Sequence, residues 1–135
     1  MNTNQKMIEP QAAAELIEYY YQKGWTDGLP VVPPSETTVN NMLAAASLEA
    51  EEIVGEVTVR NTLVSAQKIA INAVMAGCLP EYMPVVVSAV KGICHPDFGY
   101  HGMATSTGGA SVAIIVNGPI AQKLGINSQD NAFGP

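Results

Sequence analysis

Charged residues are scarce in this sequence: Asp, Glu, Lys and Arg make up 13% of its 135 residues, about half of the share usual in soluble domains. Six scattered Lys and Arg stand against twelve Asp and Glu, for a formal net charge of −6. Phosphate backbones and anionic membranes are both bound by clustered basic residues. The sequence therefore predicts no nucleic-acid partner and no membrane partner. A surface with so little charge also predicts that another subunit covers part of it.

Long apolar runs and common catalytic motifs are missing as well. No run reaches the roughly 18 residues of a membrane span, and the first residues lack the basic and apolar regions of a signal peptide. We therefore expect a cytoplasmic protein, in which the two cysteines, Cys78 and Cys94, are free thiols. A phosphate-binding glycine-rich loop, a serine nucleophile elbow and a CxxC motif are also absent. These absences count against a nucleotide-dependent enzyme.

The pattern of apolar residues predicts two strands, residues 53–60 and 111–118. The second is the clearest, because it is a continuous apolar run bounded by glycines. Helices are predicted over residues 10–23, 36–46 after an N-cap at Ser35, 62–77, 80–94 and 119–124. We expect an α/β or α+β fold in a single domain, 1–135, with a small sheet and packed helices. Two strands make a thin sheet, so we expect a second polypeptide or subunit to complete it.

Four blocks follow one another along the chain: GWTDGLPVVPPSE, AINAVMAGCLPEYMPVVVSAV, IVNGPIAQKLGIN and NAFGP. In this order, from about residue 20 to residue 135, they resemble a largely uncharacterised bacterial family. Some of its members are linked to modules with a Cys/Sec-Gly-Ser-Cys motif, which implies thiol- or selenium-linked redox chemistry. That motif is absent here, and longer relatives continue beyond the last block. The resemblance therefore implies the N-terminal portion of a longer fold, and a homo- or hetero-oligomer in which another chain supplies the C-terminal part.

Both histidines of the chain lie in one stretch, GICHPDFGYHGMATSTGG, residues 92–109. Cys94, His95 and His101 are residue types that bind zinc or iron when they converge, so one hypothesis is a metal site. The alternative is local structure: Cys94 ends a helix with its side chain inward, and His95, which precedes Pro96, starts a turn. The residue types alone leave both open.

His101 is also a candidate general acid or base, because an imidazole titrates near neutral pH. Hydroxyl groups and glycines follow it in ATSTGG, where backbone N–H groups can hold an oxyanion. The alternative is a flexible connection to the strand at 111–118. The predicted substrate-binding residues are Thr105, Ser106, Thr107, Gly108, Asn117 and Asn127.

Three residues outside this loop complete the candidate site. Cys78 lies between two predicted helices, where a helix N-terminus favours the thiolate; alternatively it is a small buried apolar residue. Asn117 stands at the carboxyl end of the predicted strand, where ligands gather in open sheets, or it caps the 119–124 helix. Asn127 binds a ligand or makes a turn.

Three hypotheses of function follow. The first is a subunit of an enzyme that acts on a small polar or anionic molecule by thiol-linked redox, elimination or hydrolysis chemistry, as an oxidoreductase, lyase or hydrolase. Its catalytic residues would be His101, Cys78 and Cys94, its cofactor is unknown, and His101 and Asn117 would share one cavity. The second is a non-catalytic scaffold subunit of a hetero-oligomer. The third is a metal-binding protein that uses Cys94, His95 and His101.

Overall fold

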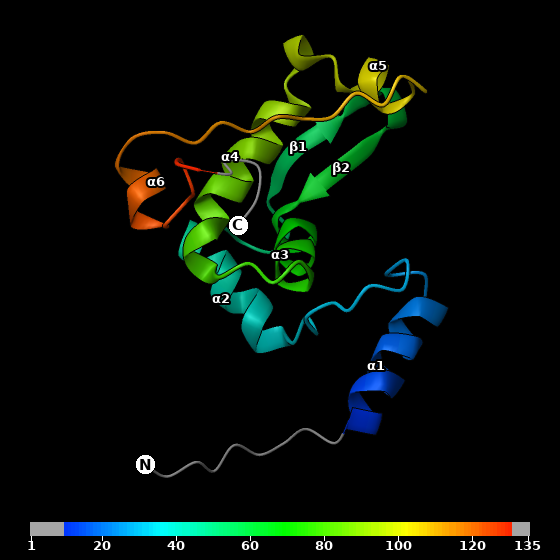
Figure 1. The fold of residues 1–135 in the computed structure, drawn as a ribbon. Helices are drawn as coiled ribbons and strands as arrows, with labels where there is room; N and C mark the ends of the chain where they lie inside the picture. The colour runs from blue at the N-terminus through cyan, green and yellow to red at the C-terminus, as the bar shows by residue number, and fades with distance from the viewer. Residues whose placement is uncertain (1–9, 131–135) are drawn as a thin grey trace.

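The computed structural model describes residues 10–130 (Figure 1). Its helices are α1 (Pro10–Gln22), α2 (Glu36–Ala46), α3 (Ala66–Met75), α4 (Met83–Cys94), α5 (Tyr100–Ala104) and α6 (Pro119–Lys123). Its strands are β1 (Ile53–Val57) and β2 (Thr62–Ser65), and single 3-10 turns cover Thr58–Arg60, Pro80–Tyr82 and Pro96–Phe98. Within this range no helix combines the length and the apolar character that crossing a bilayer requires.

The prediction of a small sheet packed with helices is confirmed. β1 and β2 form an antiparallel hairpin in which Ile53 lies opposite Ser65 and Gly55 lies opposite Val64. The register shifts between these two pairs, which marks a β-bulge next to Gly55. The hairpin packs against α4, and α2, α3 and α4 pack against one another.

The ends of the first two helices follow from single residues, as predicted. Ser35 is the N-cap of α2: its hydroxyl accepts the backbone N–H of Thr38 at 3.2 Å. Gly24 ends α1 with φ +69°, a left-handed conformation that glycine adopts without steric cost. The N–H of Trp25 then donates to the carbonyl of Tyr20 at 3.0 Å, which closes the last turn.

One predicted helix is present but starts later than expected, and one predicted strand is wrong. The helix predicted over 62–77 begins only at residue 66, because Asn61 turns the chain with φ +47° and residues 62–65 pair with β1 as β2. Ser65 then caps α3 by accepting the N–H of Lys68 at 3.4 Å. Residues 111–118, the clearest predicted strand, form no strand in the structure. They are apolar enough for one, but no other described segment pairs with them.

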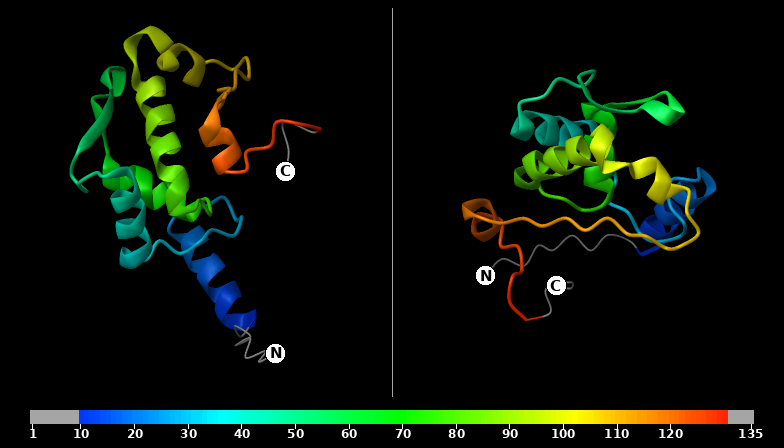
Figure 2. Two further views of the ribbon diagram at one scale, coloured as in Figure 1. Left: turned by 90° about the vertical axis from the view of Figure 1, so that its left-hand side faces the viewer. Right: turned by 90° about the horizontal axis from the view of Figure 1, so that it is seen from above.

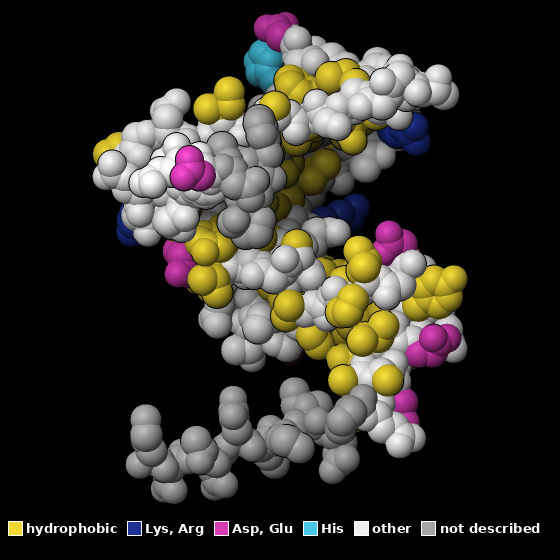
Figure 3. All heavy atoms as spheres, viewed as in Figure 1, with side chains coloured by type: hydrophobic (Ala, Val, Ile, Leu, Met, Phe, Trp, Pro, Cys, Tyr) yellow, Lys and Arg dark blue, Asp and Glu magenta, His cyan; other side chains and the backbone are white. Residues whose placement is uncertain are grey.

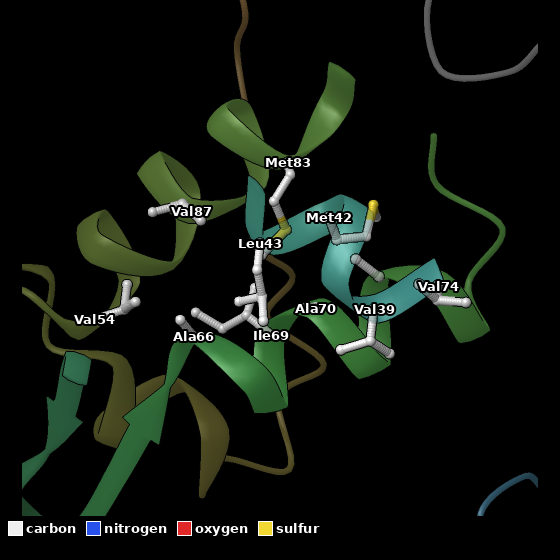
Figure 4. Packing of buried hydrophobic residues seen from close by; sticks show 11 residues of the cluster. Val39, Met42, Leu43, Val54, Ala66, Ile69, Ala70, Val74, Met83 and Val87 are labelled. Atoms are coloured by element: carbon white, nitrogen blue, oxygen red, sulfur yellow. The ribbon is translucent and has the colours of Figure 1, made fainter. Parts of the chain in front are cut away.

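The hydrophobic core lies entirely within residues 36–94, which we call the core unit. α2 contributes Val39, Met42 and Leu43, and α3 contributes Ala66, Ile69, Ala70, Ala73 and Val74; the rest are Val54 of β1 and Met83 and Val87 of α4 (Figure 4). Among the residues whose burial is described, no polar or charged side chain is buried. Apolar burial at about 25 cal/mol per Å² is therefore the main stabilising contribution to this unit.

Residues 11–30 and 100–130, the outer segments, add almost nothing to this core. Tyr20 is their only buried residue, with its ring 5.4 Å from that of Trp25. Large apolar side chains stay exposed in both segments, among them Leu29 at 68% and Ile115 at 86%. Figure 3 shows such hydrophobic side chains on the surface over α1.

The total surface of the chain is correspondingly large. It is 10314 Å², whereas a compact monomer of 14.2 kDa exposes about 6,800 Å². A fully unfolded stretch as long as the residues outside the described range would expose roughly 2,200 Å². After that amount is subtracted, the surface is still about 8,100 Å², whereas a compact domain with the mass of the described range exposes about 6,200 Å². The described part of the chain therefore exposes more surface than a self-contained domain of its size.

Candidate functional site

A small cavity of about 180 Å³ lies where the end of β1 meets the end of α4. Its lining comes from residues 56–59, from residues 93–96 and from residues 99–102, which include the start of α5. We call it the histidine cavity, because it brings together Cys94, His95 and His101. The loop that carries both histidines thus forms part of the lining, and β1 supplies another wall.

Cys94 is held against the backbone of β1. A Cβ atom placed on Gly55 would lie 2.7 Å from both the Cβ and the Sγ of Cys94, closer than side chains approach one another. Glycine at position 55 is therefore what allows the last turn of α4 to rest on the hairpin. This contact leaves the Cys94 side chain half-buried at the edge of the histidine cavity.

His95 has a structural role, the alternative to metal binding given above: it starts the turn after α4. It is the C-cap of α4, and its Nδ1 accepts the N–H of Asp97 at 3.3 Å. The same nitrogen lies 3.8 Å from Oδ2 of Asp97, with the two side chains 63% and 92% exposed. His95 thus organises the turn that leads into Pro96.

The metal site predicted from Cys94, His95 and His101 finds no support in this arrangement. Among the described residues, no three His, Cys, Asp or Glu side chains are placed to hold one ion. The physical reason is that the side chain of Cys94 packs on Gly55, whereas that of His95 bends toward the N–H of Asp97. Adjacent ligands that serve two different structural contacts do not converge.

His101 lies on α5 and is half-buried in the cavity wall beside Tyr100. The hydroxyl groups that follow it are used locally. Thr105 Oγ1 donates to the carbonyl of His101 at 2.9 Å, and Ser106 Oγ accepts the N–H of Gly108 at 3.0 Å. With Thr107 also exposed to solvent, residues 105–108 form turns outside the cavity rather than part of its lining.

Asn117 does not share a cavity with His101, contrary to the prediction. It lines a separate hollow of about 530 Å³ with Pro84, Val85 and Ser88 of α4. Its capping alternative is also wrong, because the N-cap of α6 is Gly118 and no side chain caps that helix. Without a strand at 111–118, the geometry that would have directed Asn117 toward a sheet edge is lost.

Cys78 lies away from both histidines. It follows the last turn of α3, where its N–H donates to the carbonyl of Ala73 at 2.9 Å, and its half-buried side chain packs against the core. A 3-10 turn, Pro80–Tyr82, separates it from α4, so it is not at the N-terminus of that helix. Both cysteines are free thiols and they line different cavities, as expected for a chain without a disulfide.

Asn127 makes a turn near the end of the described range. Its Oδ1 accepts the N–H of Gln129 at 3.1 Å, and its Nδ2 donates to the carbonyl of Asp130 at 3.0 Å. The oxygen and the nitrogen of the amide both bond to nearby backbone groups, so Asn127 makes a turn, as Asn residues often do in loops.

Sequence reasoning missed several residues that line hollows. Glu56 of β1 and Tyr100 of α5 line the histidine cavity; the glycine inside β1 was the signal, because it marks a close approach of another segment. A larger hollow of about 800 Å³ lies between Trp25 and the facing sides of α2 and α3, where Asn40 and Asn72 line it. No motif in the sequence pointed to this second hollow.

Comparison with known proteins gives no match: no protein family, no curated protein and no solved structure matches the chain. The chemistry of the histidine cavity is therefore the basis for inferring function. The residues that line that cavity include Cys94, His101 and Tyr100, together with Glu56, whose side chain is exposed to solvent. A thiol nucleophile beside an imidazole base is a common basis of covalent catalysis.

Proposed function

We propose that this chain is an enzyme subunit that acts on a small polar molecule in the histidine cavity, with Cys94 and His101 as its catalytic pair. The observation that carries the proposal is that Cys94 and His101 line the same cavity. In this proposal His101 accepts the thiol proton as the sulfur of Cys94 adds to an electrophilic carbonyl carbon of the substrate, whose π electron pair moves onto the oxygen. Covalent hydrolysis starts from such an attack, and in thiol-linked redox chemistry the same thiolate attacks a sulfur or oxygen atom of the substrate; in an elimination His101 would instead be the base that removes a substrate proton.

The lining of the cavity narrows the substrate class. Of its described lining residues none is Lys or Arg, whereas Glu56 contributes a carboxylate. The volume of about 180 Å³ is below the roughly 300–1,000 Å³ of sites for drug-sized ligands. We therefore propose a neutral polar substrate of a few heavy atoms rather than an anion.

The setting of the subunit is also a proposal. We place the protein in the cytoplasm and in a homo- or hetero-oligomer, in keeping with the family that its sequence blocks resemble. Support for the oligomer comes from the exposed apolar side chains of the outer segments and from the large accessible surface. The family resemblance also favours thiol chemistry among the reaction classes.

Alkylation of the two thiols tests the catalytic pair. Cys94 should react with iodoacetamide about tenfold faster than Cys78 at pH 7, because only Cys94 has an imidazole to accept its proton. His101→Gln should slow alkylation of Cys94 to the rate of Cys78, whereas His95→Gln should have a smaller effect, because Nδ1 of His95 already accepts the N–H of Asp97. Rates for each cysteine are read by peptide mass spectrometry. Equal rates for the two thiols, or no effect of His101→Gln, would falsify the proposal.

A charged reagent of similar shape tests the substrate class. The ratio of the iodoacetamide rate to the iodoacetate rate should be larger at Cys94 than at Cys78, because the carboxylate of Glu56 repels the anionic reagent. Glu56→Gln should remove most of this excess discrimination. If iodoacetate is the preferred reagent at Cys94, the proposal of a neutral substrate fails, while the catalytic pair stands.

A scaffold subunit is the second candidate function, and one observation favours it. The described part of the chain exposes more surface than a compact domain, with large apolar side chains among the exposed residues. A subunit whose main role is to bind other chains has this property. Under this reading Cys94 and Cys78 alkylate at similar rates, and substitutions in the outer segments break the assembly.

A further inference from the structure

Residues 110–117, ASVAIIVN, form an extended segment that pairs with nothing in the described part of the chain. No hydrogen bond joins a backbone N–H or C=O of this segment to another described residue. Its apolar side chains are exposed too, with Ile114 at 59% and Ile115 at 86%. A row of free backbone groups with β-branched side chains is a template for pairing with another strand.

The hairpin of the same chain is not within reach of this segment. Figure 2 shows α4 between the hairpin and the extended segment in both views. Ile114 and Ile115 line a hollow with Pro84 and Val85 of α4, so the segment lies along the side of the helix that faces away from β1. Within the described part of the chain, the hairpin therefore does not serve as a strand partner for residues 110–117.

Natural edge strands carry charges, prolines or bulges that discourage such pairing. Residues 110–117 contain no charged residue and no proline. Residues 98–122 contain no Asp, Glu, Lys or Arg, whereas the whole chain has a net charge of −6. Two copies of an acidic chain repel each other over most of their surface. Electrostatic repulsion between two copies is weakest at residues 98–122, and identical apolar side chains can pack against each other across two antiparallel strands.

We propose that residues 110–117 pair with the same segment of a second copy of this chain, as antiparallel strands about a two-fold axis. Such an interface is isologous and closes at two copies. A stable interface needs about 800 Å² from each partner, so the interface must extend beyond the eight paired residues to other exposed apolar side chains, such as Ile120 and Ile126. The pairing does not depend on the histidine cavity, so it stands or falls separately from the proposed function.

Light scattering of the full chain tests the dimer. At tens of micromolar the mass should be twice 14.2 kDa, and Ile115→Lys should return it to one copy, because it places two like charges in the interface. The matched control is Leu29→Lys, which changes an equally apolar and exposed residue outside the segment and should leave the dimer intact. A wild-type monomer, a dimer that tolerates Ile115→Lys, or growth beyond two copies overturns the proposal.

Proline substitution and cross-linking test the strand geometry. Neighbouring N–H groups point to opposite edges of a strand, so of Ala113→Pro and Ile114→Pro one should weaken the dimer at least tenfold more than the other. Neither N–H is hydrogen-bonded within the described part of the chain. In a Cys78→Ser/Cys94→Ser background, single cysteines introduced along 110–117 should form a disulfide dimer most readily near the centre. Equal effects of the two prolines, or cross-linking only at the ends of the segment, would contradict antiparallel self-pairing.

Discussion

The core unit and the outer segments are both rich in apolar residues, but they use them in opposite ways. In residues 36–94 the apolar side chains recur at helical spacing and point to one shared centre, so eleven of them form a buried cluster. In residues 100–130 the apolar residues lie on an extended segment and on short helices, and none is buried. An apolar composition therefore does not make a core. A core needs facing partners on several sides, and in the described outer segments Tyr20 alone is buried.

The core unit should be far more sensitive to truncation of a side chain than the outer segments. Met83 is completely buried, so Met83→Ala should lower the free energy of unfolding by about 2–5 kcal/mol through lost transfer energy and a new cavity. Leu29→Ala, at a side chain that is 68% exposed, should cost less than about 0.5 kcal/mol. Urea denaturation at one fixed protein concentration measures both. Comparable losses in the two variants would mean that the outer segments have a buried face after all.

The junction between the core unit and the histidine cavity should show the next largest effect. Gly55→Ala places a Cβ 2.7 Å from Cys94, so α4 and the hairpin must separate, at a cost of about 1–3 kcal/mol. Gly92→Ala is the matched control: it lies in α4 with nothing within 4 Å of its added Cβ and should stabilise the helix by about 0.5–1 kcal/mol. Thermal unfolding gives both signs. A Gly55→Ala variant as stable as the parent would show that α4 does not rest on the hairpin.

Two serines with similar hydrogen bonds give the smallest and most direct comparison. Ser35 Oγ accepts the N–H of Thr38 at 3.2 Å at the start of the core unit, and Ser106 Oγ accepts the N–H of Gly108 at 3.0 Å in an outer segment. Ser35→Ala should cost about 1 kcal/mol, because it removes a helix cap. Ser106→Ala should cost less than about 0.5 kcal/mol, since the turn it supports is solvent-exposed and remote from the core. The chemical-denaturation midpoints of the two variants test this order, and a reversed order would refute it.

Local signals in the sequence were sufficient wherever a single residue determines the backbone. Ser35 marked the start of α2, Gly24 marked the end of α1, and the His95-Pro96 pair marked the turn after α4. Each of these depends on side-chain chemistry or on allowed backbone angles within a few residues. Such features can be predicted without knowing what lies on the other side of the molecule.

Prediction failed where structure depends on a distant partner. The 111–118 run has strand composition but no strand to pair with among the described residues, and residues 62–65 pair with β1 although their pattern continues that of a helix. The same dependence explains the site. His101 and Cys94 were found because they are close in sequence, whereas Glu56 enters the histidine cavity only through the packing of β1 on α4.

The contact between Gly55 and Cys94 links the shape of the hairpin to the position of the thiol. A methyl group is missing at residue 55, and the sulfur occupies the space that it would have filled. Any tilt of the hairpin relative to α4 therefore changes how deeply the sulfur sits, without a change in any residue of the loop around the histidines. The position of the sulfur at the histidine cavity is in this way set by the sheet as well as by the loop around the histidines.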